Sequence, residues 1–194
     1  MYIKKEFILI IIFGIIAIFS LFINKKNTNL QFRKLGLYGH KTLCKHKLLN
    51  HQHLIIPNLW LGDYESSQNI KFLKDNNIKL IINLSKNLNF VTEKNIEKYR
   101  IPIHDNLSKE SNLGLIKHFD EAYLKIEKTL KNNDGVLIHC RAGVQRSAAL
   151  TALYLMKKNK ITSDDAKKFI KGKRCIVFFN KANFEPVLKY YDYI

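Results

Sequence analysis

The spacing of hydrophobic residues divides the chain into three parts. Residues 7–23 carry no charge and would present apolar side chains on every face of a helix. A helix of this length reaches about 25 Å, which is at the short end of a bilayer span. Residues 24–52 are polar and basic, without a clear period. From residue 53 onward, short apolar runs alternate with amphipathic stretches, so residues 53–194 are expected to form one folded domain.

Within that domain, the pattern predicts strands that alternate with helices. Such an order favours an α/β fold with a central, mostly parallel sheet flanked by helices. The expected strands are 54–56 and 59–62, separated by a turn at Pro57 and Asn58, and then 78–83, 99–103 and 136–139. The expected helices run from Ser66 or Ser67 to about Asn76, over 116–130 and 147–159, from Thr162 or Ser163, and from about Asn183 to the end.

We expect residues 1–23 to be an N-terminal membrane anchor, in which residues 7–23 form the transmembrane helix. The run is longer than the core of a cleaved secretory signal, no cleavage motif of small residues closes it, and Lys25 and Lys26 follow directly. The excess of positive charge after the span places the C-terminal part in the cytosol. Three cysteines at irregular spacing fit free thiols in that reducing compartment. The sequence therefore predicts a single-pass membrane protein with residues 24–52 as a basic linker and a cytosolic domain.

The net charge of +17 changes this picture little. Most of the charge comes from lysine, and arginines and aromatic residues are not interleaved in one patch, so we expect no nucleic-acid partner. A basic surface still favours anionic partners in general. His40, Cys44, His46, His51 and His53 suggest zinc, but their spacing matches no ordinary zinc module and fits a solvated linker. No metal and no cofactor is expected.

A short loop between a predicted strand and a predicted helix carries the candidate chemistry. The apolar run 136–138 leads to His139 and Cys140, and Gly143 permits the tight turn that precedes Arg146 and Ser147. The N–H groups of the loop can then point inward beside the free donors of the helix N-terminus. This would form a phosphate-binding cradle from Arg141, Ala142, Gly143, Val144, Gln145 and Arg146.

The same environment favours the thiolate form of Cys140, because a helix N-terminus and a neighbouring arginine both stabilise negative charge. Arg146 offers a planar fork for two phosphate oxygens. Ser147 can donate a hydrogen bond to the sulfur and so make it a better leaving group. His139 is expected to order the loop through backbone contacts rather than carry protons. The alternative, a structural cysteine in the core, leaves the spacing of Cys, Gly, Arg and Ser unexplained.

HCRAGVQRS, residues 139–147, resembles the His-Cys-x5-Arg-Ser/Thr loop of the cysteine-dependent protein tyrosine phosphatase superfamily. Its surroundings are similar to the dual-specificity branch, and the matching segments are 59–62, 78–85, 101–106 and 152–156. The resemblance covers residues 53–194. It implies a phosphatase-like fold and hydrolysis of phosphotyrosine and phosphoserine/threonine in proteins through a cysteinyl phosphate.

The family resemblance also implies a general acid, and the local chemistry agrees, because an alkoxide or phenoxide leaves poorly unless it is protonated. Asp105 follows an expected strand on a polar loop and is our candidate. Asp120 and Glu121 are weaker rivals, because the helical period places them on a solvated face.

Two positions depart from the family pattern. The family often has Ser or Asn where this chain has Gln145, and we expect the Gln145 side chain to point outward and alter substrate fit. The Pro-Asn-x-x-Phe segment appears as residues 179–184, without the proline and one residue longer. Cys175 could form a protective disulfide with Cys140, although a buried core residue is the simpler interpretation.

Two other functions remain open at this point. The loop could serve a phosphatase for phosphoinositides or RNA 5′-phosphates, which Arg141, the expected anchor and the basic surface favour. The lipid branch, however, usually has a second basic residue where this chain has Val144 and Gln145. A non-catalytic phospho-binding module is the second alternative, but such relatives typically lack the nucleophile, whereas Cys140, Arg146 and Asp105 are all present.

Overall fold

A computed structural model describes residues 50–104, 106, 108–179 and 183–192. The expected membrane span and most of the linker lie outside these residues, as does Asp105. Within the part of the chain that is described, no helix is both long enough and apolar enough to cross a bilayer.

The predicted α/β fold is confirmed, with a five-stranded sheet in the order β1-β2-β5-β3-β4. The first pair is antiparallel and the other three pairs are parallel. The strands are β1 (Gln52–Ile56), β2 (Leu59–Gly62), β3 (Ile78–Asn83), β4 (Glu97–Arg100) and β5 (Gly135–His139). The helices are α3 (Tyr64–Gln68), α4 (Ile70–Asp75), α5 (Lys109–Lys131), α6 (Arg146–Asn159), α7 (Ser163–Lys173) and α8 (Glu185–Tyr191).

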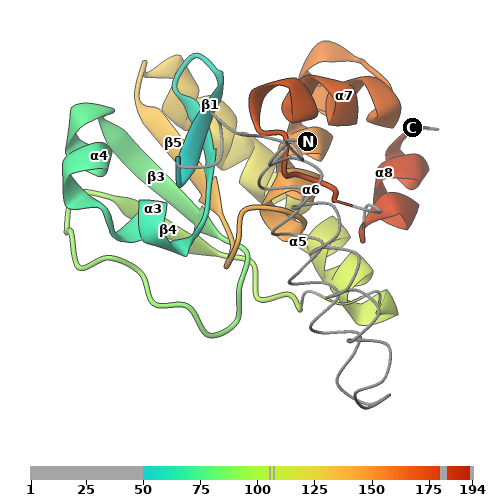
Figure 1. Ribbon diagram of the computed structural model, residues 1–194, viewed down its shortest axis with the longest axis horizontal. Helices are drawn as coiled ribbons and strands as arrows, with labels where there is room; N and C mark the ends of the chain where they lie inside the picture. The colour runs from blue at the N-terminus through green and yellow to red at the C-terminus, as the bar shows by residue number, and fades with distance from the viewer. Residues whose placement is uncertain (1–49, 105, 107, 180–182, 193–194) are drawn as a thin grey trace, which may run out of the picture. The chain divides into compact units, whose positions relative to one another are not determined.

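Helices cover both faces of the sheet, with α3 and α4 on one side and α5 to α8 on the other (Figure 1). Alternate strand residues face opposite sides. Ile81 and Leu137 join the smaller core with Phe72 and Leu73 of α4. Their neighbours along the strands join the larger core: Leu80, Ile82, Val136 and Ile138. Helix α6 is buried from Arg146 to Met156, as its nearly continuous apolar sequence predicts.

Several element boundaries differ from the prediction. The expected helix from Ser66 or Ser67 to about Asn76 is two short helices, because Asn69 ends α3 and its side chain accepts a hydrogen bond from Phe72 N to begin α4. Asp63, rather than a serine, caps α3, because its side chain accepts from Ser66 N at 3.0 Å. The serine hydroxyls instead donate back to the carbonyls of Asp63 and Tyr64.

The edge strand and two further helices also shift. The strand expected over 99–103 is β4, Glu97–Arg100, since Pro102 has no N–H for the ladder and Ile103 N donates to Ile101 O in a tight turn. Helix α5 begins at Lys109, where Ser108 caps it by accepting from Ser111 N at 3.2 Å. Helix α8 begins at Glu185 rather than Asn183, with a proline in its first turn.

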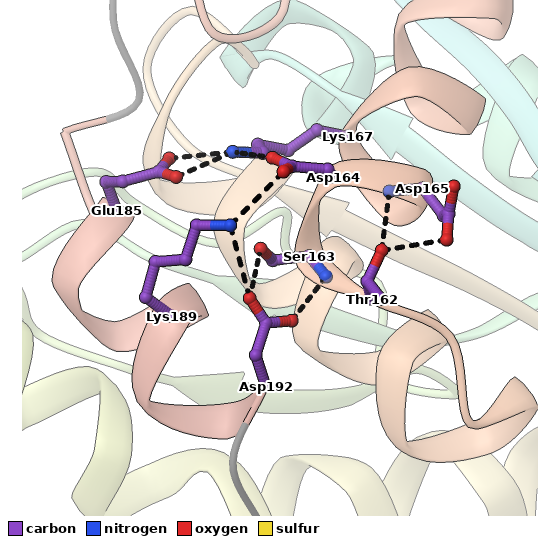
Figure 2. Close-up of polar contacts among 8 residues, drawn as sticks. All are labelled: Thr162, Ser163, Asp164, Asp165, Lys167, Glu185, Lys189 and Asp192. Carbon is purple, nitrogen blue, oxygen red and sulfur yellow. Dashed lines mark hydrogen bonds and ion pairs between the residues drawn. The ribbon is translucent and has the colours of Figure 1, made fainter.

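Polar contacts fasten α8 to the start of α7 (Figure 2). Asp192, the residue after α8, accepts hydrogen bonds from Ser163 N and Ser163 Oγ, both at 2.6 Å. Lys189 lies 3.2 Å from Asp164 and 3.3 Å from Asp192. Lys167 adds an ion pair to Glu185 at 2.7 Å. These contacts hold α8 against α7.

Candidate active site

The candidate loop leaves the carboxyl end of the central strand. His139, the last residue of β5, pairs with Gly62 of β2 and Asn83 of β3. Cys140 follows directly, is only 1% exposed and is a free thiol. The chain then turns into α6, whose first residue is Arg146. The strand–loop–helix arrangement predicted from the sequence is therefore confirmed, at the edge of the sheet where ligands of parallel α/β folds bind.

Four consecutive carbonyl groups of this loop accept hydrogen bonds from outside it. The pairs are Tyr64 N to Arg141 O (3.2 Å), Arg174 Nη2 to Ala142 O (3.2 Å), Arg174 Nε to Gly143 O (2.9 Å) and Phe178 N to Val144 O (3.0 Å). In a planar trans peptide, the N–H of the next residue points opposite to the carbonyl. The N–H groups of residues 142–145 therefore point away from these outer partners, and such a row of donors is an anion-binding concavity.

Gly143 is needed for this turn for two reasons. Its φ is +64°, in the left-handed region that favours glycine. A Cβ atom here would also lie 2.5 Å from Gly62 O, a backbone atom at the end of β2 that cannot easily move aside. The loop is thus packed against the end of β2 and hydrogen-bonded to Tyr64, the first residue of α3.

Ser147 and Arg146, the first two residues of α6, reach Cys140 and the segment after β3 respectively. Ser147 Oγ donates to Cys140 Sγ at 3.2 Å, and both residues are buried. Arg146 is 8% exposed, and its Nη1 donates to Ser85 Oγ at 3.0 Å and to Leu84 O at 3.3 Å. The guanidinium therefore bridges from α6 to the segment that follows β3.

Arg100 holds that segment in place. From the end of β4, its guanidinium donates to the carbonyls of Ser85, Lys86 and Leu88 and lies over the Phe90 ring, 4.8 Å from the centroid. Sequence reasoning did not identify Arg100, since it follows an ordinary strand pattern.

His139 is fully buried, and burial lowers its pKa to about 4. The charges of Arg100 and Arg146 act in the same direction, whereas Asp63 and the backbone of Cys140 oppose the shift. The imidazole is consequently neutral near pH 7. The ordering role expected of His139 stays a prediction.

Asp105, the predicted general acid, lies outside the described residues. The rival carboxylates on α5 are engaged elsewhere: Asp120 pairs with Lys157 of α6 at 2.7 Å, and Glu121 accepts from Tyr99 Oη at 2.8 Å. Neither rival has a described contact with the candidate loop.

The prediction that Gln145 points outward was wrong. Gln145 is 8% exposed, its Oε1 accepts from Asn183 N at 3.0 Å, and its Nε2 donates to Phe179 O at 3.4 Å. The longer amide side chain thus connects the loop to both ends of the segment that lacks the family's proline. The segment is one residue longer than in the family pattern, and this difference was the signal that could have suggested a buried contact with Gln145.

Arg174 was also missed. It lies 28 residues after Arg146, in the run KGKR that reads as part of a solvated basic helix, yet it is only 2% exposed. The only hint was its position next to the apolar run 176–179, which is typical of a buried segment.

One cluster of possible metal ligands occurs among the described residues: His51, Asp63 and Glu65, whose donor atoms lie within 4.8 Å of one another. The hydrogen bond of 2.8 Å between His51 Nδ1 and Asp63 accounts for the closest pair. His53, another member of the suspected zinc set, has its Nδ1 2.8 Å from Arg174 Nη1.

Comparisons with known proteins show which sequences and folds this chain resembles. The family model described as dual specificity phosphatase, catalytic domain, matches residues 59–192. Dual specificity protein phosphatase 9 of Homo sapiens is 39% identical over 62% of this chain and 31% of its own length. Dual specificity protein phosphatase 6 of Homo sapiens is 38% identical over the same shares. The chain thus spans about a third of the length of these curated relatives.

Among solved structures, the crystal structure of human DUSP28 has a TM-score of 0.68 and covers 74% of this chain and 94% of its own. Its sequence identity is 21%, so this match demonstrates a common fold.

Proposed function

Because the chain belongs to the dual specificity phosphatase family, we propose that it hydrolyses phosphotyrosine and phosphoserine/threonine in proteins. Cys140 is the nucleophile, Arg146 and the amides of residues 141–146 bind the phosphate, and Asp105 is the general acid. Ser147 supports the sulfur, and His139 orders the loop. The reaction needs no cofactor.

The observation that carries the proposal is the hydrogen bond of 3.2 Å from Ser147 Oγ to Cys140 Sγ, at the base of a loop in which the carbonyls of residues 141–144 accept hydrogen bonds from outside it. A thiolate in this place gains a hydrogen bond and the field of the α6 N-terminus. A core cysteine of purely structural function requires neither.

In the first step, the Cys140 thiolate attacks phosphorus and a P–S bond forms. The bond between phosphorus and the substrate oxygen breaks, and Asp105 gives its proton to that oxygen, so that a neutral hydroxyl leaves. The guanidinium of Arg146 and the loop amides stabilise the charge on the three non-bridging oxygens.

In the second step, water attacks the phosphorus of the cysteinyl phosphate. The Asp105 carboxylate takes a proton from this water, the P–S bond breaks, and inorganic phosphate is released. The electron pair returns to sulfur, and the hydrogen bond from Ser147 stabilises the thiolate as it leaves.

We further propose that residues 7–23 anchor the protein in a membrane, that residues 24–52 are a linker and that residues 53–194 form the catalytic domain on the cytosolic side. The support is the apolar composition of residues 7–23 and the excess of lysine after them.

The test uses the purified full chain with phosphotyrosine and phosphothreonine peptides and with an aryl phosphate. Cys140→Ser should abolish hydrolysis of all three. Asp105→Ala should slow peptide hydrolysis by about 10²- to 10⁴-fold, and should slow the aryl phosphate less, because its phenolate leaves readily without protonation. Asp120→Ala is the matched control and should retain full activity. Phosphatase activity that survives Cys140→Ser would refute the mechanism.

A further inference from the structure

Arg174 lies directly behind the phosphate-binding loop and is almost completely buried, with 2% of its surface exposed. Its Nε donates to Gly143 O at 2.9 Å and its Nη2 donates to Ala142 O at 3.2 Å. These are two of the four carbonyls that must face outward for the loop amides to face inward. One planar side chain therefore fixes two consecutive peptide groups at the centre of the loop.

The remaining donors of Arg174 attach the loop to the first strand. Nη1 lies 3.3 Å from Asn50 O and 2.8 Å from His53 Nδ1. Arginine has no acceptor, so His53 Nδ1 must accept this hydrogen bond, and a neutral His53 carries its proton on Nε2. Through Arg174, the loop is connected to β1 at the point where residues 24–52 enter the domain.

The charge of Arg174 has no carboxylate partner in ion-pair contact among residues 50–104, 106, 108–179 and 183–192. Burial lowers the pKa of the guanidinium, and the negative charges of Asp63 and Cys140 act against that shift. A buried cation without a salt bridge is costly, and in the described part of the chain its direct hydrogen-bond partners are three carbonyl oxygens and an imidazole nitrogen. The guanidinium lies behind the loop, where its positive charge would stabilise an anion bound on the other side.

We propose that Arg174 is a positioning residue for the phosphate-binding loop: it holds Ala142 and Gly143 with their carbonyls outward and adds positive charge behind the anion. The inference rests on the proposed function, because it assigns the loop to phosphate. Arg174 touches neither substrate nor sulfur and acts through the backbone.

The test measures anion binding instead of turnover. Inorganic phosphate should protect Cys140 of the full chain from iodoacetamide, and the phosphate concentration that halves the alkylation rate gives the affinity. In Arg174→Met this concentration should rise by about tenfold or more, because two charge-assisted hydrogen bonds to the loop are lost. The midpoint pH of alkylation should rise in the same variant.

Lys173→Met is the matched control, since it removes the same charge from an exposed neighbour. Phosphate should protect Cys140 of this variant as it does in the wild type. Arg174→Lys keeps the charge without the fork and should fall between wild type and Arg174→Met. If Arg174→Met fails to fold by circular dichroism, the Lys variant decides the question. The inference would be overturned if phosphate protected Cys140 of a folded Arg174→Met variant as well as it protects the wild type. If Arg174→Met does not fold, the same result for Arg174→Lys would overturn it. Protection that depends on Arg174 without hydrolysis of any substrate would reject the proposed function alone.

Discussion

At the scale of single residues, the contact that bears most directly on the proposed turnover is the hydrogen bond from Ser147 to the Cys140 sulfur. Ser147→Ala removes it without changing the backbone of α6. Because the bond stabilises sulfur as a leaving group, hydrolysis of the cysteinyl phosphate should slow by roughly 10- to 100-fold, which corresponds to a hydrogen bond to a charged group. Formation of the intermediate should change less.

The measurement is rapid-quench kinetics with an aryl phosphate, in which Ser147→Ala should give a burst of one phenolate per enzyme before slow steady turnover. Thr129→Ala is the control, because the Thr129 hydroxyl donates only to Lys125 O within α5. A variant that turns over as fast as the wild type and shows no burst would exclude this role for Ser147.

The sequence could suggest candidate residues whose spacing falls within one loop, from Cys140 to Ser147, and the structure confirms that this loop joins β5 to α6. It did not identify residues that act across the fold. Arg174 contacts the loop, and Arg100 contacts the segment after β3, only through the tertiary structure. The sequence around each arginine shows no motif that would single it out. Gln145 was assigned to the wrong side of the loop for the same reason, since its partners Phe179 and Asn183 are more than 30 positions away.

At the scale of elements, Asp192 connects two helices that the sequence presented as independent. Asp192→Asn should lower the free energy of unfolding by about 1–2 kcal/mol, because a charged acceptor of two hydrogen bonds at the start of α7 becomes a neutral amide. Urea unfolding at pH 7 measures the difference. Asp75→Asn, in an exposed pair with Lys71, is the control and should have little effect.

The pH dependence of this effect has a defined sign. Burial would raise the pKa of Asp192, but the Ser163 hydrogen bonds and Lys189 outweigh it and lower the pKa below 3.8. Asp192 therefore stabilises the fold at pH values above 3.8, and this contribution is lost as the pH falls through the lower folded-state value. The difference between wild type and Asp192→Asn should be full at pH 7 and shrink at pH 3. A difference that grows on acidification would contradict the assignment.

Periodicity predicted the existence and type of nearly every element, and erred where a local side chain overrides the pattern. The helix expected to continue to Asn76 is interrupted because Asn69 offers its own cap. The edge strand was placed too late because Pro102 and the turn at Ile103 end the ladder after Arg100. Both errors concern hydrogen bonds that periodicity does not report.

At the scale of the whole molecule, the α/β order of the elements was predictable from the alternation of short apolar runs and amphipathic helices. The strand order was not, because nothing in β5 itself places it between β2 and β3. Its uninterrupted apolar run, Val136–Ile138, indicated only that it is buried on both faces. The central position matters because it places Cys140 between two neighbouring strands.

The relation between the catalytic domain and the N-terminal segment gives the last prediction. If residues 7–23 span a bilayer, the full chain should stay in the membrane pellet after an alkaline carbonate wash. Replacing Ile15 and Ile16 by lysine places two charges near the middle of the segment, and each costs about 2.5–3.5 kcal/mol of insertion free energy. The variant should then partition to the supernatant, while Ile15→Leu with Ile16→Leu should remain in the pellet. Hydrolysis of a dissolved aryl phosphate should be equal in all three proteins, because this substrate reaches the site without the membrane. A double-lysine variant that stays in the washed pellet would show that another part of the chain holds the protein there.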